Sequence, residues 1–191
     1  MTHRSAHPTR RRLLAAAGAA LCVPGAARAR DTEPPVGWVQ PRAAPPAWPL
    51  ALAGGGRASL QQLVQGRLTA VQLMFTGCTT SCSLQGLHFA QAAARARRVP
   101  VQWLSISIDA LGDDAARLQA WQQRFGPHPS WRAAVPAPRD VDALAGFLRG
   151  VDSSGTHTEQ VFVFDRAGRL AWRSGDQPGD ELLERLFEAL A

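Results

Sequence analysis

Two cysteines four positions apart stand at a predicted junction between a buried strand and a helix. The apolar run 70–75, broken only by Gln72, predicts the strand, and a helical pattern begins at about Ser81. Cys78 and Cys82 would therefore lie about one helical turn apart on one face. The start of a helix favours a thiolate over a thiol, because unpaired backbone N–H groups face the sulfurs there. Such a pair can close as a disulfide or bind a soft metal ion.

The positive charge of the chain is concentrated near its N-terminus. The 191 residues carry a formal net charge of +6, without any lysine, and five of the 21 arginines precede position 30. The other 16 arginines nearly balance the 15 acidic residues, all of which lie beyond position 30. This near-neutral body leaves no basic stripe, so we expect no nucleic-acid partner.

Residues 1–29 have the layout of an export signal. Three arginines at positions 10–12 precede two leucines, an apolar run continues to Val23, and Ala27-Arg28-Ala29 fits a small-x-small cleavage site. The paired arginines resemble the twin-arginine export motif, and an ordinary secretory signal is the alternative. The apolar run is shorter than the roughly 20 residues that span a bilayer. We therefore expect cleavage near Ala29, a periplasmic location and no membrane anchor on the mature chain.

The number of cysteines favours chemistry over a structural crosslink. Cleavage near Ala29 would remove Cys22 and leave only Cys78 and Cys82. A disulfide that closes so short a loop would restrict the unfolded chain little, because the entropic gain grows with loop length. A binding or scaffold domain whose cysteines are merely oxidised remains an alternative.

The domain organisation follows from composition and periodicity. Residues 30–47 are rich in proline and alanine and predict an extended linker, and residues 48–191 predict the folded domain. Within the domain the patterns predict a glycine-turn hairpin at 50–60, a helical turn at 60–64, strands at 68–75 and 99–108, helices at about 81–98, 114–125, 140–150 and 180–190, and a second hairpin at 161–173. Leu84 and Leu87 belong to the predicted apolar stripe of the long helix. A loop through Pro136 and Pro138 is expected before the helix that begins at Asp140.

This order of elements predicts an α/β protein with a thioredoxin-like fold. Its central mixed sheet would be flanked by helices, with an N-terminal hairpin as an extension. In that arrangement a redox or metal site stands at the start of the first long helix, where the cysteine pair lies.

Three segments resemble the Sco/SenC family. The stretch from Phe75 to Cys82 resembles its Cys-x-x-x-Cys segment, the strand that ends at Asp109 resembles its second core strand, and His157-Thr158 before the hairpin resembles its histidine-bearing loop. These segments occur in the right order across the whole predicted domain. Asp109 would be either a neighbour that orients the site or the cap of the next turn.

The resemblance implies a copper site made of Cys78, Cys82 and His157, loaded with Cu(I) or Cu(II). Members of the family deliver copper to the binuclear copper centre of cytochrome c oxidase, or reduce the cysteines of that centre. Thiolates favour Cu(I), and imidazole accepts either oxidation state of copper. Such a chain would be a metallochaperone and not an enzyme. Its partner would be the oxidase copper subunit or another periplasmic thiol protein.

The same residues support a second hypothesis. Cys78 and Cys82 could cycle between dithiol and disulfide without metal, as the redox pair of a thiol-disulfide oxidoreductase. The sequence also departs from the family pattern, because Thr79 and Ser83 occupy positions where the family usually has proline. Without proline the backbone φ angles there are less restricted, so metal binding or redox behaviour would differ from the family's.

Overall fold

The computed structural model describes residues 35–95, 98–151 and 159–191 of the chain. The predicted export signal, residues 1–29, and the predicted ligand His157 lie outside these ranges. The strands are β1 (Gly37–Ala43), β2 (Pro49–Leu52), β3 (Arg57–Ser59), β4 (Leu68–Met74), β5 (Val101–Ser107), β6 (Trp131–Pro136), β7 (Val161–Phe164) and β8 (Leu170–Arg173). The helices are α1 (Leu60–Val64), α2 (Ser81–Ala94), α3 (Ala115–Gln123), α4 (Val141–Arg149) and α5 (Asp180–Leu190), with a 3-10 turn η1 at Pro138–Asp140.

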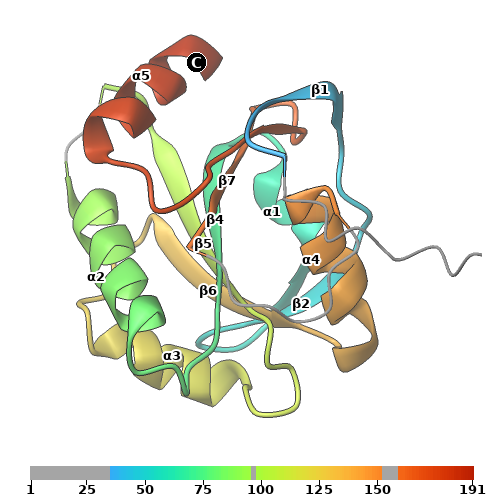
Figure 1. The fold of residues 1–191 in the computed structure, drawn as a ribbon. Coiled ribbons are helices and arrows are strands. Elements are labelled where there is room, and N and C mark those ends of the chain that lie inside the picture. Colours follow the sequence, from blue (N-terminus) through green and yellow to red (C-terminus); the bar gives the residue numbers. More distant parts are fainter. Residues whose placement is uncertain (1–34, 96–97, 152–158) are drawn as a thin grey trace, which may run out of the picture. The chain divides into compact units, whose positions relative to one another are not determined.

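The described strands form one mixed sheet in the order β1-β8-β7-β4-β5-β6-β2-β3 (Figure 1). Strands β4, β5 and β6 run parallel, and every other neighbouring pair is antiparallel. The predicted mixed sheet flanked by helices is therefore confirmed, and β2 and β3 form the predicted N-terminal hairpin. Because β4 and β5 are parallel, the loops that follow them leave the same end of the sheet.

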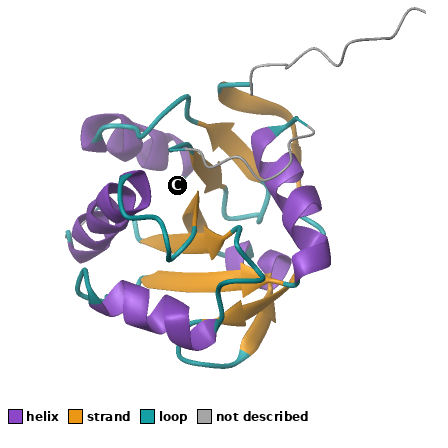
Figure 2. Cartoon of the chain, turned by 60° about the horizontal axis from the view of Figure 1, so that its bottom comes forward, coloured by secondary structure: helices purple, strands orange, loops and turns teal. Residues whose placement is uncertain are grey.

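Helices cover both faces of the sheet, as Figure 2 shows in a second view. In β4, the side chains of Ala70 and Met74 pack with α2, α3 and α5, while those of Val71 and Leu73 pack with α1 and α4. This alternation follows from the two-residue period of a strand. Every residue of β4 and β5 is buried, which is typical of a central parallel strand covered on both faces.

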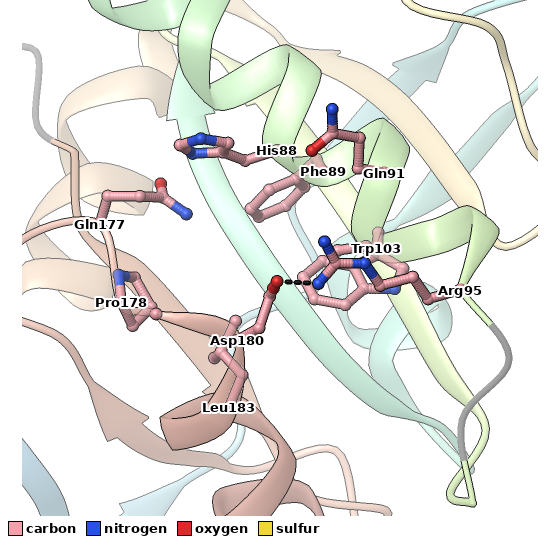
Figure 3. A pocket seen from close by; sticks show the side chains of 11 residues that line it. His88, Phe89, Gln91, Arg95, Trp103, Gln177, Pro178, Asp180 and Leu183 are labelled. Atoms are coloured by element: carbon pink, nitrogen blue, oxygen red, sulfur yellow. Dashed lines mark hydrogen bonds and ion pairs between the residues drawn. The ribbon is translucent and has the colours of Figure 1, made fainter.

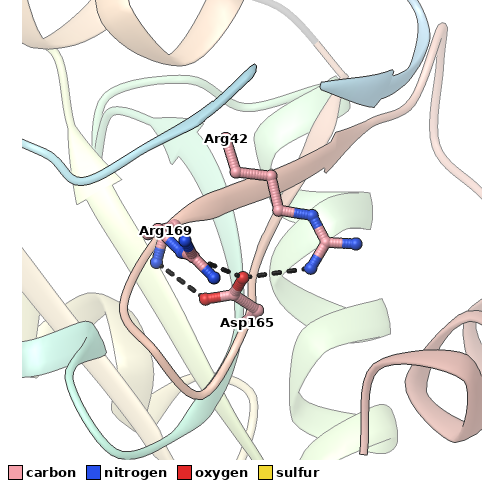
Figure 4. A network of polar contacts seen from close by, with 3 residues as sticks. All are labelled: Arg42, Asp165 and Arg169. Atoms are coloured by element: carbon pink, nitrogen blue, oxygen red, sulfur yellow. Dashed lines mark hydrogen bonds and ion pairs between the residues drawn. The ribbon is translucent and has the colours of Figure 1, made fainter. Parts of the chain in front are cut away.

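Strand β1 lies in the proline-rich stretch predicted to be a linker. It pairs with β8 at one edge of the sheet and includes Pro41, which an edge strand tolerates because one side of its backbone needs no ladder bond. Arg42 Nη1 lies 3.1 Å from Asp165 Oδ2, and the backbone N–H of Arg169 donates to Asp165 Oδ1 (Figure 4). The sheet thus includes residues before position 48, whereas the division of the chain into signal, linker and domain stays a prediction.

The prediction of a loop through Pro136 is wrong. Residues Trp131–Pro136 form strand β6, which lies between β5 and β2. Prolines on both sides of this short segment, together with two alanines inside it, weakened the strand pattern. Pro136 is the last residue of the strand, a position where its missing N–H disturbs the ladder least.

Helix α2 differs from its prediction in length and in buried face. It ends at Ala94, and Arg95 has an extended backbone. Leu84 and Leu87, predicted to be part of the apolar stripe, are 62% and 40% exposed. The buried face instead contains Cys82, Gln85, Gly86, Phe89, Ala90, Ala92 and Ala93. A polar glutamine and a glycine on this face shift it away from the leucines, which sequence patterns alone do not reveal.

Candidate functional site

The two cysteines lie between the end of β4 and the first turn of α2. The backbone N–H of Cys78 donates to Phe75 O at 3.2 Å, which makes a tight turn after the strand. The N–H of Cys82 donates to Cys78 Sγ at 3.4 Å. The helix starts without a side-chain cap from Thr80, so the sulfur of Cys78 accepts one of the N–H groups that a helix start leaves unpaired.

The sulfurs differ in burial and in acidity, and both cysteines are free thiols. Burial raises the pKa of Cys78, but hydrogen bonds with the Cys82 side chain and backbone, the Thr80 backbone and the Ser81 hydroxyl outweigh it and lower that pKa from 9.0 to about 7. Cys82 is fully buried; burial and its hydrogen bond to Cys78 raise its pKa to about 12. Cys78, which is half-buried, is therefore the accessible and more nucleophilic thiol of the pair.

Asp113 holds the cysteine loop in place from a neighbouring loop. Its carboxylate accepts hydrogen bonds from the Thr76 N–H at 2.9 Å, from the Thr76 hydroxyl, and from the Ser107 hydroxyl at 2.6 Å. The Asp113 residue is only 7% exposed, so these three donors depend on it. Its neighbour Asp114, where the predicted helix of about 114–125 begins, caps α3 by accepting a hydrogen bond from the Arg117 N–H. The contact of Asp113 with Thr76 joins positions 37 residues apart, so no local pattern indicates it.

Asp109 is the cap of a turn. Its Oδ1 accepts a hydrogen bond from the Gly112 N–H at 2.8 Å, which closes the loop after β5. A Cβ atom at Gly112 would clash with the Asp109 carboxylate, so a larger residue there would force that carboxylate to shift. The hydrogen bond from Gly112 thus supports the role of Asp109 as the cap of the next turn, which was one of the two roles expected for it.

Two serine hydroxyls lie near Cys78, and one of them, Ser83, occupies a position where the Sco/SenC pattern usually has proline. Ser83 Oγ donates to the Cys78 carbonyl oxygen at 3.4 Å, and Ser81 Oγ lies 3.8 Å from Cys78 Sγ. A hydroxyl at position 83 can thus tie the loop to the helix by a hydrogen bond, whereas proline would restrict it through its ring.

The predicted third ligand, His157, lies outside the described residues. Among the residues that the structure does describe, no group of three His, Cys, Asp or Glu side chains could hold a metal ion. His128 interacts through Nδ1 with Ser130, away from the cysteines. His88 lines a cavity of about 200 Å³ between α2 and α5, where it lies near Gln177 (Figure 3). The cysteines do not line this cavity, and Arg95 and Asp180 form an ion pair in it.

The donor atoms present fit a soft metal ion. Two sulfurs of a Cys-x-x-x-Cys pair lie at a helix start, and such soft thiolate ligands suit Cu(I) as well as zinc. The lowered pKa of Cys78 makes its thiolate available near neutral pH. Cys82 must lose a proton to become a ligand, and metal binding commonly drives such a loss.

The family follows from the sequence of the folded part. The model of the SCO1/SenC family matches residues 51–190. The chain belongs to the SCO1/SenC family. The resemblance drawn from the three sequence segments is thereby confirmed. A comparison with curated proteins gives no match for this SCO1/SenC chain.

Solved structures share the fold of this SCO1/SenC chain. A SCO1/SenC family lipoprotein from Bacillus anthracis is 20% identical with a TM-score of 0.64, over 78% of this chain and 99% of that one. Arabidopsis thaliana ScoI, described with copper bound, is 17% identical with a TM-score of 0.63, over 76% and 97%. BsSco, described as having a disulfide switch and as a member of the Sco family of cytochrome c oxidase assembly proteins, is 14% identical with a TM-score of 0.63, over 80% and 96%. At these identities the likeness establishes the thioredoxin-like fold that the sequence predicted. Within the described ranges, no helix has the length and apolar character to cross a bilayer.

Proposed function

We propose that this SCO1/SenC protein is a periplasmic copper metallochaperone. Copper is its cargo, bound by Cys78, Cys82 and His157 and delivered to the binuclear copper centre of cytochrome c oxidase. The observation that carries the proposal is the cysteine pair itself, with both sulfurs at the start of α2 and joined by the Cys82 N–H to Cys78 Sγ contact. Copper bound to Arabidopsis ScoI and the assembly role given for BsSco support the choice of cargo and partner.

The place of His157 in the proposed site is supported by the sheet register. Val161 of β7 pairs with Gln72 of β4 in antiparallel orientation. The start of β7 therefore lies at the same end of the sheet from which the cysteine loop leaves β4. His157 precedes Val161 by four residues, and an extended chain of that length reaches up to about 14 Å.

An anaerobic Cu(I) titration of the reduced protein tests the metallochaperone proposal. We expect one tightly bound equivalent in the wild type, and His157→Ala to weaken the affinity by about tenfold or more, or about 1.4 kcal/mol. His128→Ala is the matched control, because His128 interacts with Ser130 outside the site, and it should bind as the wild type does. Equal affinities for all three proteins would remove His157 from the site, and no tight equivalent in the wild type would overturn the proposal.

A second function, thiol-disulfide exchange, is favoured by the unequal burial of the two cysteines. Cys78 is accessible enough to attack a disulfide, and the fully buried Cys82 is placed to resolve the mixed disulfide that forms. The disulfide switch described for BsSco supports this alternative. Here Cys78→Ser or Cys82→Ser should abolish turnover of a disulfide substrate while His157→Ala leaves it intact. A requirement for His157 in that assay would count against metal-free chemistry.

The export signal completes the proposal. Residues 1–29 would direct the chain to the periplasm, by the twin-arginine or the general secretory route, and cleavage near Ala29 would release it. Blocking each export route in turn while following cleavage of the full-length chain distinguishes the two. An uncleaved chain retained in the cytoplasm under all conditions would contradict the location.

A further inference from the structure

Gln85 is a buried polar residue on the inner face of α2. It is 2% exposed, and neither its Oε1 nor its Nε2 has a hydrogen-bond partner among the described residues. An unpaired buried amide costs about 1–3 kcal/mol, so native structures satisfy nearly all such groups. The amide of Gln85 therefore calls for a hydrogen-bond partner that the described residues of the metal-free protein do not supply.

The other buried glutamines make the contrast clear. Each of them donates at least one hydrogen bond from its Nε2, to Ser105 Oγ from Gln72, to Leu63 O from Gln102, to Trp131 O from Gln122 and to Ser174 O from Gln160. Within the described ranges, Gln85 is thus the buried glutamine without a partner at either end of its amide. The fold is able to satisfy buried carboxamides, so the state of Gln85 is specific to its position.

That position is next to the cysteine pair. Gln85 follows Cys82 by three residues, and both belong to the buried face of α2. Side chains three residues apart on a helix are neighbours, and a long helical side chain leans toward the helix N-terminus. By this geometry we expect the Gln85 side chain to be directed toward the turn that carries Cys82. The next residue, Gly86, packs closely against the rings of Trp121 and Phe125: a Cβ atom there would lie 2.8 Å from a ring carbon of each. These rings give the Gln85 amide no hydrogen bond on this part of the helix.

We propose that Gln85 is a positioning residue whose Nε2–H donates a hydrogen bond to the Cys82 sulfur when that sulfur holds copper. This inference rests on the proposed copper site. A thiolate ligand with no exposure to water has few sources of hydrogen bonds, and a bond from a neighbouring group orients the sulfur and tunes the metal. In the metal-free protein Cys82 is a thiol, which needs no donor, and the amide stays unpaired.

The test compares two buried glutamines in the full-length protein. Gln85→Met keeps the length of the side chain but removes the donor, so the Cu(I) affinity should fall by about 10- to 100-fold. The melting temperature of the metal-free protein should stay equal or rise, because an unpaired polar group has been removed. Gln122→Met is the matched control. It loses the bond to Trp131 O, so its melting temperature should fall while its Cu(I) affinity stays that of the wild type.

A spectroscopic readout is independent of affinity. In the Cu(II)-loaded protein the sulfur-to-copper charge-transfer band should shift in Gln85→Met and not in Gln122→Met, because only the former changes the bonding of a ligating sulfur. If Gln85→Met binds Cu(I) with wild-type affinity and melts lower, as Gln122→Met does, the inference is overturned. A buried water shared with Trp121 Nε1, which is also unpaired, would then explain the amide. Absence of tight copper binding in the wild type overturns the proposed function and this inference together.

Discussion

The pKa of Cys78 is lowered and that of Cys82 is raised, although the two sulfurs lie about one helical turn apart. Their surroundings explain the difference. Cys78 receives the Cys82 N–H and the field of the helix start, whereas Cys82 is enclosed by the core beneath α2. The sequence predicted the pair and its chemistry, because spacing alone brings the sulfurs to one face. It could not predict which thiol is accessible, since that depends on packing against β4, α3 and α5.

The reactivity of the cysteines should follow their pKa values. Because the pKa of Cys78 is lowered to about 7, its alkylation by iodoacetamide should reach half of its maximal rate near that pH. At more acidic pH the thiolate is protonated, so the rate should fall about tenfold per pH unit. Cys82, with its pKa raised to about 12, should remain almost unlabelled. Mass spectrometry of peptides labelled across this pH range measures both rates.

A variant without Cys78 checks the assignment. Cys78→Ser should lose the fast labelling completely. Equal labelling rates for the two cysteines in the wild type would contradict the difference in burial.

Asp113 should be more important for stability than its neighbour Asp114. Asp113→Ala leaves the Thr76 N–H, the Thr76 hydroxyl and the Ser107 hydroxyl without their acceptor, so the free energy of unfolding should fall by about 3 kcal/mol. Asp114→Ala, the matched control, removes only a helix cap and should cost about 1 kcal/mol. Urea denaturation measures both. Equal losses would show that the cysteine loop does not depend on Asp113.

At the level of elements, the strongly patterned segments were predictable and the short irregular ones were not. Strand β4, the amphipathic α4 and α5, and both hairpins follow from periodicity and turn residues. Strand β1 was missed because Pro41 interrupts it, and β6 because prolines flank it. Both are stabilised by pairing with strands distant in the sequence. Tertiary pairing overrides local propensity in such segments.

The contact of α2 with α3 predicts an unusual response to alanine. In an isolated helix Gly→Ala stabilises by about 1 kcal/mol. Here a Cβ at Gly86 would approach rings of Trp121 and Phe125 to 2.8 Å, so Gly86→Ala should instead destabilise the protein by about 1–3 kcal/mol. Gln91→Ala, at an exposed site of the same helix, is the control and should change stability little. A higher melting temperature for Gly86→Ala would mean that α3 can move away at little cost.

At the level of the whole molecule, the parallel order of β4 and β5 brings the cysteine loop and the loop of Asp113 to one end of the sheet. The order of predicted elements and the resemblance to the SCO1/SenC family both placed the site at the start of the first long helix. The position of His157 relative to the sulfurs stays a prediction.

Binding of cargo should stabilise the entire fold by mass action. At free Cu(I) a hundredfold above its dissociation constant, the gain is about 2.7 kcal/mol, which for a chain of this size raises the melting temperature by about 5–10 °C. Anaerobic differential scanning fluorimetry with and without Cu(I) measures the shift. Cys82→Ser should abolish the shift, because one of the two sulfurs is gone. A shift retained in that variant would place the ion elsewhere on the protein.

The outermost strands have a consequence for how the protein behaves at high concentration. On one margin β1 contains a proline and loses register with β8 between Trp38 and Ala43, and on the other β3 is three residues long. Neither offers a long flat row of free amide groups to a neighbouring molecule. Within the described ranges, the two edges of the sheet should therefore give little template for fibril growth between crowded copies, although β4 and β5 are buried throughout.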